Sequence, residues 1–246
     1  MTAPAELAAA RARSDLPPGD GERFAGYGIM AQPFRSGHVL ALRRFPHTSI
    51  GAGYTSVWHG DPDGRWTMWS DVASLQSCPR YFGPALAAAE EAAIDIEWPG
   101  PWSIRVRING ILDWRTAIGP TPATRLMTTL GSHLPDPLWR NRVVLAAMSR
   151  AAGPALRAGA VRLQGHVPSG QWFRVKIPRI WATTEVGATV HGDDLGPAGP
   201  THPQRWLGGF ALPNRGLFAI GSATFETYRP ERHVRVLPTT AAPRSD

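Results

Sequence analysis

Residues 54–71 have the sequence YTSVWHGDPDGRWTMWSD, in which two stretches rich in aromatic and β-branched residues flank the turn sequence DPDG at 61–64. That turn favours a type I conformation whose glycine is left-handed, and it predicts a β-hairpin in which Trp58 opposes Met68. One face then carries Tyr54, Ser56, Trp58, Trp66, Met68 and Ser70, and the other carries Thr55, Val57, His59, Thr67, Trp69 and Asp71. Because aromatic groups occupy both faces, we expect both to be covered, as when a sheet encloses a cavity and also packs on helices.

The next hairpin pairs its charges on one face. AIDIEW at 93–98 and SIRVRI at 103–108 flank a Pro-Gly-Pro turn. A register that sets Glu97 opposite Arg105 also sets Asp95 opposite Arg107. We therefore interpret these two carboxylates as solvent-side partners of arginines rather than as a catalytic pair.

The dipeptide Asn109-Gly110 predicts a third hairpin whose register has two solutions. A strict two-residue turn places Asp113 and Arg115 on the same face as Val106. A bulge reverses this, so that Trp114 is buried and the charges are exposed. We favour the bulge because it buries more apolar surface, and Asp113 stays the most informative position.

The middle of the chain predicts two helices. Thr121-Pro122 and Asp136-Pro137 each combine an N-cap residue with a proline at the first helical position, and the helices should end near Gly131 and Gly153. Strand and turn patterns return after them. The fold class is therefore mainly β, an antiparallel barrel or sandwich with an inserted helical pair. We expect a flexible segment over 1–23, one β-rich domain over 24–229 with its helical insertion at 121–153, and a loose tail over 230–246.

Composition narrows the classes of function. The net charge is +7, but the basic residues are almost all arginine and are spread along the chain. Cys78 is the only cysteine, so an internal disulfide and a multi-cysteine metal site are excluded. The first twenty residues lack a continuous apolar run, which predicts a cytoplasmic protein without membrane insertion.

Motifs for common chemistry are absent. No G-x-G-x-x-G, P-loop, H-E-x-x-H or G-x-S-x-G sequence occurs. His59, Asp71, His191 and Asp193 would have to converge to hold a metal, and nothing in their spacing requires it. Cys78 lies in a segment predicted to be a loop, where a lone thiol is usually inert. We expect neither a metal nor a cofactor.

An outer stripe of cationic residues offers one alternative function. Arg162, Arg174, Lys176 and Arg179, with Trp172 among them, could contact phosphates or single-stranded nucleic acid. The stripe is short and interrupted, so we favour a solvated sheet face and do not expect a nucleic-acid partner.

The remaining candidates are polar or aromatic strand residues that could point into a cavity. The catalytic candidates are His59, Asp71 and Asp113, because burial would shift their pKa values toward acid–base work. The ligand-binding candidates are Tyr54, Trp58, Trp69, Arg115 and Glu226. The alternative is that these tryptophans only fill a large core.

The run at 54–71, the paired hairpins and the closing strand GSATFETY at 221–228 resemble the lipocalin-like barrels of the carotenoid 1,2-hydratase and AttH type, over residues 37–228. The helical pair departs from that family. The resemblance implies a tunnel for an apolar, often isoprenoid, substrate and cofactor-free addition, elimination or isomerisation. We therefore expect a small apolar ligand, isoprenoid- or polyketide-like, with proton transfer by His59 and an aspartate. The alternatives are a non-catalytic carrier and an anion-binding or nucleic-acid-binding module. The oligomeric state is left open.

Overall fold

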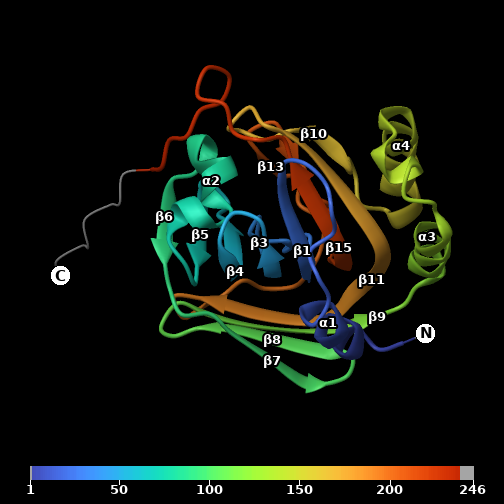
Figure 1. Ribbon diagram of the computed structural model, residues 1–246. Helices are drawn as coiled ribbons and strands as arrows, with labels where there is room; N and C mark the ends of the chain where they lie inside the picture. Colours follow the sequence, from blue (N-terminus) through green and yellow to red (C-terminus); the bar gives the residue numbers. More distant parts are fainter. Residues whose placement is uncertain (1, 239–246) are drawn as a thin grey trace.

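The computed structural model describes residues 2–238, which form one strongly curled, mixed β-sheet with helices around it (Figure 1). The strands of the sheet are β1 (Glu22–Ile29), β2 (Gln32–Pro33), β3 (Val39–Thr48), β4 (Ala52–Gly60), β5 (Trp66–Ser70), β6 (Ala88–Glu91), β7 (Asp95–Gly100), β8 (Ser103–Ile108), β9 (Leu112–Gly119), β10 (Gln164–His166), β11 (Trp172–Val190), β12 (Asp193–Asp194) and β15 (Leu217–Phe225). Their main order is β6-β5-β4-β3-β1-β15-β11-β9-β8-β7, and only the pair β5–β6 is parallel. A separate small hairpin consists of β13 (Trp206–Leu207) and β14 (Phe210–Ala211). The predicted mainly β class with inserted helices is confirmed.

The hairpin registers follow the sequence patterns closely. β4 and β5 pair Trp58 with Met68, as the DPDG turn predicts. β7 and β8 set Glu97 opposite Arg105, and Asp95 is exposed. Both registers are confirmed, and so is the solvent-side position of these two carboxylates.

The turn at Asn109 takes the bulged form. Ile108 pairs with Leu112, which leaves three residues in the loop instead of two. The side chain of Trp114 is therefore buried, and Asp113 lies on the opposite face of β9. The strict two-residue register is wrong because it would have put an aspartate into an apolar core while exposing a tryptophan.

Two bulges and a pair of glycines bend the middle of the sheet. Gly26 of β1 pairs with Gly221 of β15. The ladder between β1 and β3 shifts register beside Gly26, and the ladder between β11 and β15 shifts beside Gly221. A Cβ atom on Gly26 would lie 1.9 Å from the carbonyl oxygen of Arg44, and one on Gly221 would lie 2.1 Å from that of Lys176. Only glycine fits such close approaches, so these positions allow the curl.

The described helices are α1 (Pro4–Ala12), α2 (Pro79–Phe82), α3 (Pro122–His133) and α4 (Arg142–Leu156), with 3-10 turns η1 (Ser74–Gln76), η2 (Gly83–Ala85) and η3 (Leu138–Arg140). Thr121 caps α3 as predicted, in a reciprocal capping box with Thr124. The predicted start of the second helix at Asp136-Pro137 is wrong. That dipeptide precedes η3, the Asp136 carboxylate pairs with Lys176, and the side chain of Asn141 caps α4.

Each face of the sheet has its own core. One core contains Trp69 of β5 and Trp114 of β9, strands that lie far apart in the sheet order. These side chains can meet only because the sheet curls around them. The second core contains Trp58 and Phe173 and is covered by α2 and the β13–β14 hairpin. The expectation that both faces of the 54–71 hairpin are covered is confirmed.

Both ends of the described chain contact the sheet. α1 packs against β1 and β3, and the backbone amide of Ala5 donates to the carbonyl of Pro101. At the other end, the amide of Val234 donates to the carbonyl of Ser169. The loose tail is predicted over residues 230–246, of which 239–246 lie outside the described residues. None of the helices in residues 2–238 is long and apolar enough to cross a membrane.

Candidate ligand-binding cavity

A cavity of about 410 Å³ lies between the Trp58 face of the sheet and the helical pair. Its size falls within the range of small-molecule sites. β1, β3, β4, β11 and β15 form one wall, and α3 and α4 form another. The contributing side chains are predominantly apolar, among them Phe24, Trp58, Met127, Met148, Val175 and Ala223.

Small residues in the middle of the sheet leave this space open. Gly26 and Gly221, the pair held by the two bulges, both border the cavity, and so do Ala219 and Ala223 of β15. Larger apolar residues surround them. The sequence thus places a patch with little side-chain volume in this wall, which leaves space between the sheet and the helical pair.

Arg43 is the charged group most deeply buried in the cavity wall, with 8% of the residue exposed. On β3 it shares a face with Ala41 and Phe45. Its Nη1 donates to the carbonyls of Ile29 at 2.7 Å and Leu42 at 2.8 Å, and its Nη2 donates to Met30 at 3.0 Å. Within residues 2–238 it has no carboxylate partner.

The guanidinium of Arg43 also stacks over the Trp58 ring, 4.6 Å from its centroid. Burial lowers the pKa of Arg43 to about 10, so it remains charged at neutral pH. Three of its five N–H groups point to carbonyls, which leaves Nε and one hydrogen of Nη2 without a protein acceptor in the described chain. N–H groups of a guanidinium that lack a protein acceptor are suited to bind a carboxylate.

Two phenols and a thiol line the same wall. The Tyr54 hydroxyl and the Cys78 Sγ atom lie 3.4 Å apart, and both groups are buried. Burial raises the pKa of the Cys78 thiol, so it is protonated at neutral pH and is a poor nucleophile. The segment predicted to be a loop instead places Cys78 directly before α2.

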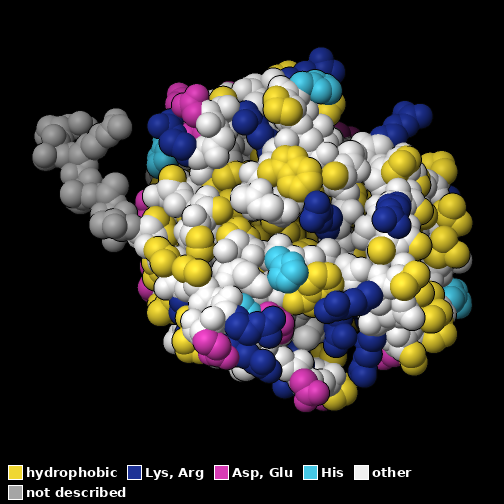
Figure 2. Space-filling view, turned by 90° about the horizontal axis from the view of Figure 1, so that it is seen from above, with side chains coloured by type: hydrophobic (Ala, Val, Ile, Leu, Met, Phe, Trp, Pro, Cys, Tyr) yellow, Lys and Arg dark blue, Asp and Glu magenta, His cyan; other side chains and the backbone are white. Residues whose placement is uncertain are grey.

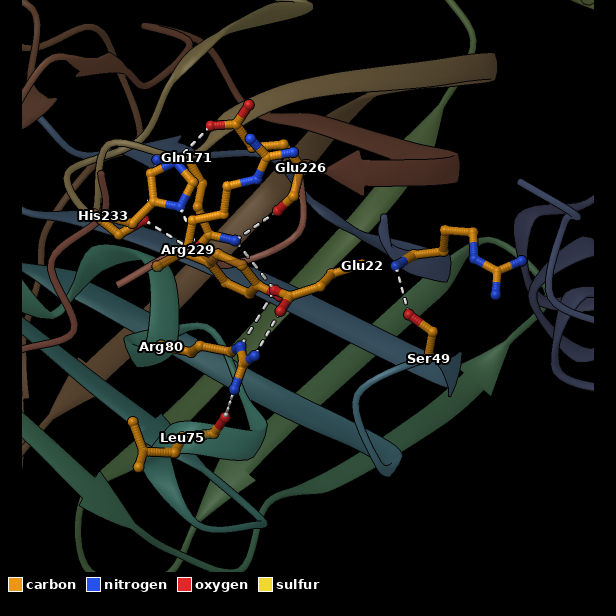
Figure 3. A network of polar contacts seen from close by, with 11 residues as sticks. Glu22, Ser49, Leu75, Arg80, Gln171, Glu226, Arg229 and His233 are labelled. Atoms are coloured by element: carbon orange, nitrogen blue, oxygen red, sulfur yellow. Dashed lines mark hydrogen bonds and ion pairs between the residues drawn. The ribbon is translucent and has the colours of Figure 1, made fainter. Parts of the chain in front are cut away.

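Tyr81 of the cavity wall joins a polar network around Glu22. Figure 3 shows the contacts of Glu22 with Arg80 and Gln171. The Tyr81 hydroxyl donates to Glu22 at 2.6 Å, and Arg80 donates to both carboxylate oxygens at 2.5 and 3.2 Å. Gln171 also reaches Glu22 and links it to the backbone of Glu226. Burial alone would raise the pKa of Glu22, but these hydrogen bonds outweigh it and hold the pKa below its ordinary value. Glu22 is thus fully engaged by the protein.

The structure brings two of the eight predicted site residues to this cavity, Tyr54 and Trp58. His59, Trp69 and Asp71 alternate with them along the hairpin and lie on the other face of the sheet. Asp71 accepts from the amide of Thr55 at 2.7 Å, and Trp69 donates to Glu90 at 3.0 Å.

The other three predicted residues lie outside the cavity wall. Asp113 is held by Arg105 through two hydrogen bonds of 3.0 and 2.6 Å. Arg115 is exposed on the same face, 3.9 Å from Asp113. Glu226 contacts His233 at 2.5 Å in the network of Figure 3. We expected these residues to converge with His59 on one cavity, and the structure does not bring them together there. Their catalytic and ligand-binding roles stay predictions.

His59 takes part in a small histidine cluster instead. Its Nε2 lies 2.9 Å from Nδ1 of His38, and its ring stacks on Trp69. Burial, followed by the nearby His38, lowers the pKa of His59 to about 4. Among the described residues no group of three or more His, Cys, Asp and Glu side chains is arranged to hold a metal ion.

Residues of the predicted outer stripe make several local contacts. Arg162 lies 5.3 Å from the centre of the Trp206 ring, and Lys176 pairs with Asp136. Arg174 borders a second hollow of about 280 Å³, which also includes Arg11 and Arg140. Of the four cationic residues only Lys176 pairs with a carboxylate of the described chain, and the absence of a nucleic-acid partner stays a prediction.

Arg43 is the site residue that the sequence analysis missed. The alternation of apolar residues in VLALRRF at 39–45 was the available signal, since it places Arg43 with Ala41 and Phe45 and sends Arg44 to the other face. The three carbonyl acceptors could not be foreseen, because two of them, Ile29 and Met30, lie at the end of β1 and directly after it.

Fold and site together define a class of protein: a curled, mostly antiparallel sheet with an apolar cavity between one face and a helical pair. No family model and no curated protein matches the chain. Similar solved structures include an acetoacetate decarboxylase from Legionella pneumophila subsp. pneumophila, at TM-score 0.41 and 12% identity over 90% of this chain and 89% of that one. A second acetoacetate decarboxylase structure gives TM-score 0.39 and 10% identity over 90% and 91%. The curled sheet fits a lipocalin-like fold, whereas membership of the carotenoid 1,2-hydratase and AttH family is not shown.

Proposed function

We propose that this protein binds a small, mostly apolar molecule that ends in a carboxylate, and that it carries this ligand without altering it. The observation behind the proposal is Arg43, a buried guanidinium on the wall of an apolar cavity that has no carboxylate partner in the described chain. A buried charge is costly unless it is paired, and a ligand carboxylate would supply the missing partner.

Carriage is favoured over acid–base catalysis by the composition of the cavity wall. None of the described residues that line it is His, Asp, Glu or Lys. The acid–base hypothesis requires a histidine and an aspartate facing the ligand, whereas His59 lies on the other face of the sheet. Tyr54 and Cys78 are buried, and burial raises the pKa of each, so neither is a ready base at neutral pH.

Calorimetry at neutral pH can compare the affinity of the protein for a fatty acid with its affinity for the alcohol of the same chain length. We expect the acid to bind more tightly. Arg43→Met should weaken acid binding by about tenfold to a hundredfold, the value of one charge-assisted hydrogen bond, and should change alcohol binding little. Arg43→Lys keeps a positive charge and should show an intermediate loss.

Arg44→Gln is the matched control, because it removes a neighbouring guanidinium from the other face of β3 and should leave both affinities unchanged. Near-ultraviolet circular dichroism checks that each variant keeps its packed tryptophans. Equal affinity of the native protein for acid and alcohol would contradict the proposed role of Arg43 in binding the carboxylate. Failure to bind either compound would overturn the proposed function.

A further inference from the structure

The outward faces of α3 and α4 expose apolar side chains. Leu126 and Leu130, four residues apart on α3, are each 55% exposed, and Val143 at the start of α4 is 77% exposed. Ala147 and Ala151 continue the line of Val143 at intervals of four residues and are also exposed. Figure 1 places α3 and α4 together on one side of the molecule. These exposed apolar residues of two neighbouring helices are here called the helical face.

The segment that contains the helical face is also strongly basic, and Arg125 and Arg150 lie on α3 and α4 themselves. The segment 121–162 contains Arg125, Arg140, Arg142, Arg150, Arg157 and Arg162. Its one acidic residue is Asp136, which is already paired with Lys176. Within the part of the chain that the structure describes, none of these six arginines forms an ion pair. Figure 2 shows apolar and cationic side chains interspersed over α3 and α4, at the right of the view.

The helical face adjoins the cavity. Leu130 is largely exposed and also belongs to the cavity wall, to which Met127 and Val144 contribute from the same two helices. A ligand that leaves the cavity beside Leu130 thus meets exposed apolar side chains flanked by arginines. The second hollow, lined by Arg11, Arg140 and Arg174, shares Trp139 with the cavity and extends the basic surroundings.

We propose that the helical face docks reversibly on the surface of an anionic lipid bilayer and that the cavity exchanges its ligand there. The exchange step rests on the proposed function, whereas the docking step does not. Exposed Leu and Val side chains can enter the boundary between headgroups and acyl chains, and the arginines complement anionic headgroups. An apolar carboxylic acid would partition into that same boundary.

A bilayer suits this surface better than a second copy of the chain. A symmetric dimer through the helical face would bring arginines of both copies together with one acidic residue on each side to offset them, and that residue is already paired. The surface is also formed by the outer sides of two helices and not by a groove for a peptide. A lipid bilayer with anionic headgroups complements the charge of the arginines and can contact the outer sides of both helices.

The test measures flotation of the full chain with vesicles of phosphatidylcholine alone and with equimolar phosphatidylcholine and phosphatidylglycerol. We expect binding to the anionic vesicles only, and weaker binding as salt increases. Leu126→Glu should weaken binding about tenfold or more, and Arg125→Gln with Arg150→Gln about fivefold for each arginine lost. Leu75→Glu is the matched control, since Leu75 of η1 is 42% exposed away from these helices, and it should bind like the native chain.

Equal responses to Leu126→Glu and Leu75→Glu would overturn docking through the helical face. So would a native dimer that Leu126→Glu dissociates in the absence of lipid, because a second copy would then be the occupant. Fatty-acid affinity measured without vesicles separates the two proposals. Ligand binding without flotation overturns the docking alone, and flotation without ligand binding overturns the proposed function and its exchange step.

Discussion

The Arg43 side chain combines burial with a charge that no carboxylate of the described chain neutralises. It is buried and stacked on an indole, and three backbone carbonyls accept its hydrogen bonds. Carbonyl dipoles reduce the cost of burying a guanidinium, but they do not neutralise its charge. The carboxylate of the proposed ligand would offset the remaining cost. This is why Arg43 and not the cavity volume determines the kind of ligand that we propose.

His59 provides a second prediction at the scale of the residue. Its pKa is lowered by burial to about 4, so the folded protein resists protonation of a group that titrates near pH 6.5 when unfolded. The stability due to neutral His59 is complete above pH 6.5 and is lost as the pH falls from there toward 4. His59→Phe keeps an aromatic ring against Trp69 and removes the titration.

The free energy of unfolding of the native protein should therefore fall relative to that of His59→Phe as the pH decreases. The stability of the native protein relative to the variant should decrease by up to about 3 kcal/mol between pH 7 and pH 4. Urea unfolding at a series of pH values gives these quantities, and an NMR titration of the native imidazole gives its midpoint directly. A midpoint near pH 6.5 with parallel stability curves would contradict the burial of His59.

At this scale the sequence predicts the face of a residue but not its partners. Strand alternation correctly separated Trp58 from His59 and Trp69. It could not show that His59 meets His38, because that contact joins the end of β4 to the start of β3. The predicted contact between His59 and Asp113 also depended on side-chain partners. The partner of Asp113 is instead Arg105 on the adjacent strand.

At the scale of the element, the ends of α4 show how a local signal can mislead. Asp136-Pro137 fits the start of a helix as well as Thr121-Pro122 does, yet α4 begins only after Asn141. The side chain of Asn141 accepts from the amides of Val143 at 2.9 Å and Val144 at 3.2 Å. Asp136 instead forms a surface ion pair with Lys176, which is distant in sequence. A local sequence pattern cannot show that Lys176 lies beside Asp136.

Replacing the two candidate cap residues tests where α4 begins. Asn141→Ala removes a side-chain cap and should lower the free energy of unfolding by about 1 kcal/mol. Asp136→Ala removes only a surface ion pair and should cost less than about 0.5 kcal/mol. Thermal or urea unfolding of the two variants gives the comparison. The opposite order would restore the helix start at Asp136.

The hairpins were more predictable than the helix ends because turn chemistry and cross-strand charge act over a few residues. The DPDG loop and the pairing of Glu97 with Arg105 each required only local sequence. The residues that cause the curl of the sheet could not be identified from the sequence. The curl depends on Gly26 and Gly221, which meet across two strands that are almost two hundred residues apart in sequence.

At the scale of the whole molecule, the two faces of the sheet serve different ends. The face inside the curl is filled by large side chains such as Trp69, Trp114 and Trp181. The other face carries glycine and alanine at its centre and is closed by helices. A sequence with ten tryptophans could indicate either a filled core or a walled cavity, and both occur, one on each side of the same sheet.

This division predicts opposite responses to the same enlargement on the two faces. Ala223→Leu adds volume on the cavity face of β15, where space exists. It should leave the free energy of unfolding unchanged or raise it, while weakening fatty-acid binding by about tenfold or more through direct overlap with the ligand. Ala25→Leu adds the same volume at a fully buried position of β1 that does not border the cavity, and overpacking there should cost about 1–3 kcal/mol. Urea unfolding and calorimetric titration of both variants measure the two effects. If both substitutions destabilised the protein equally, the space beside Ala223 would not be a cavity able to accept a ligand.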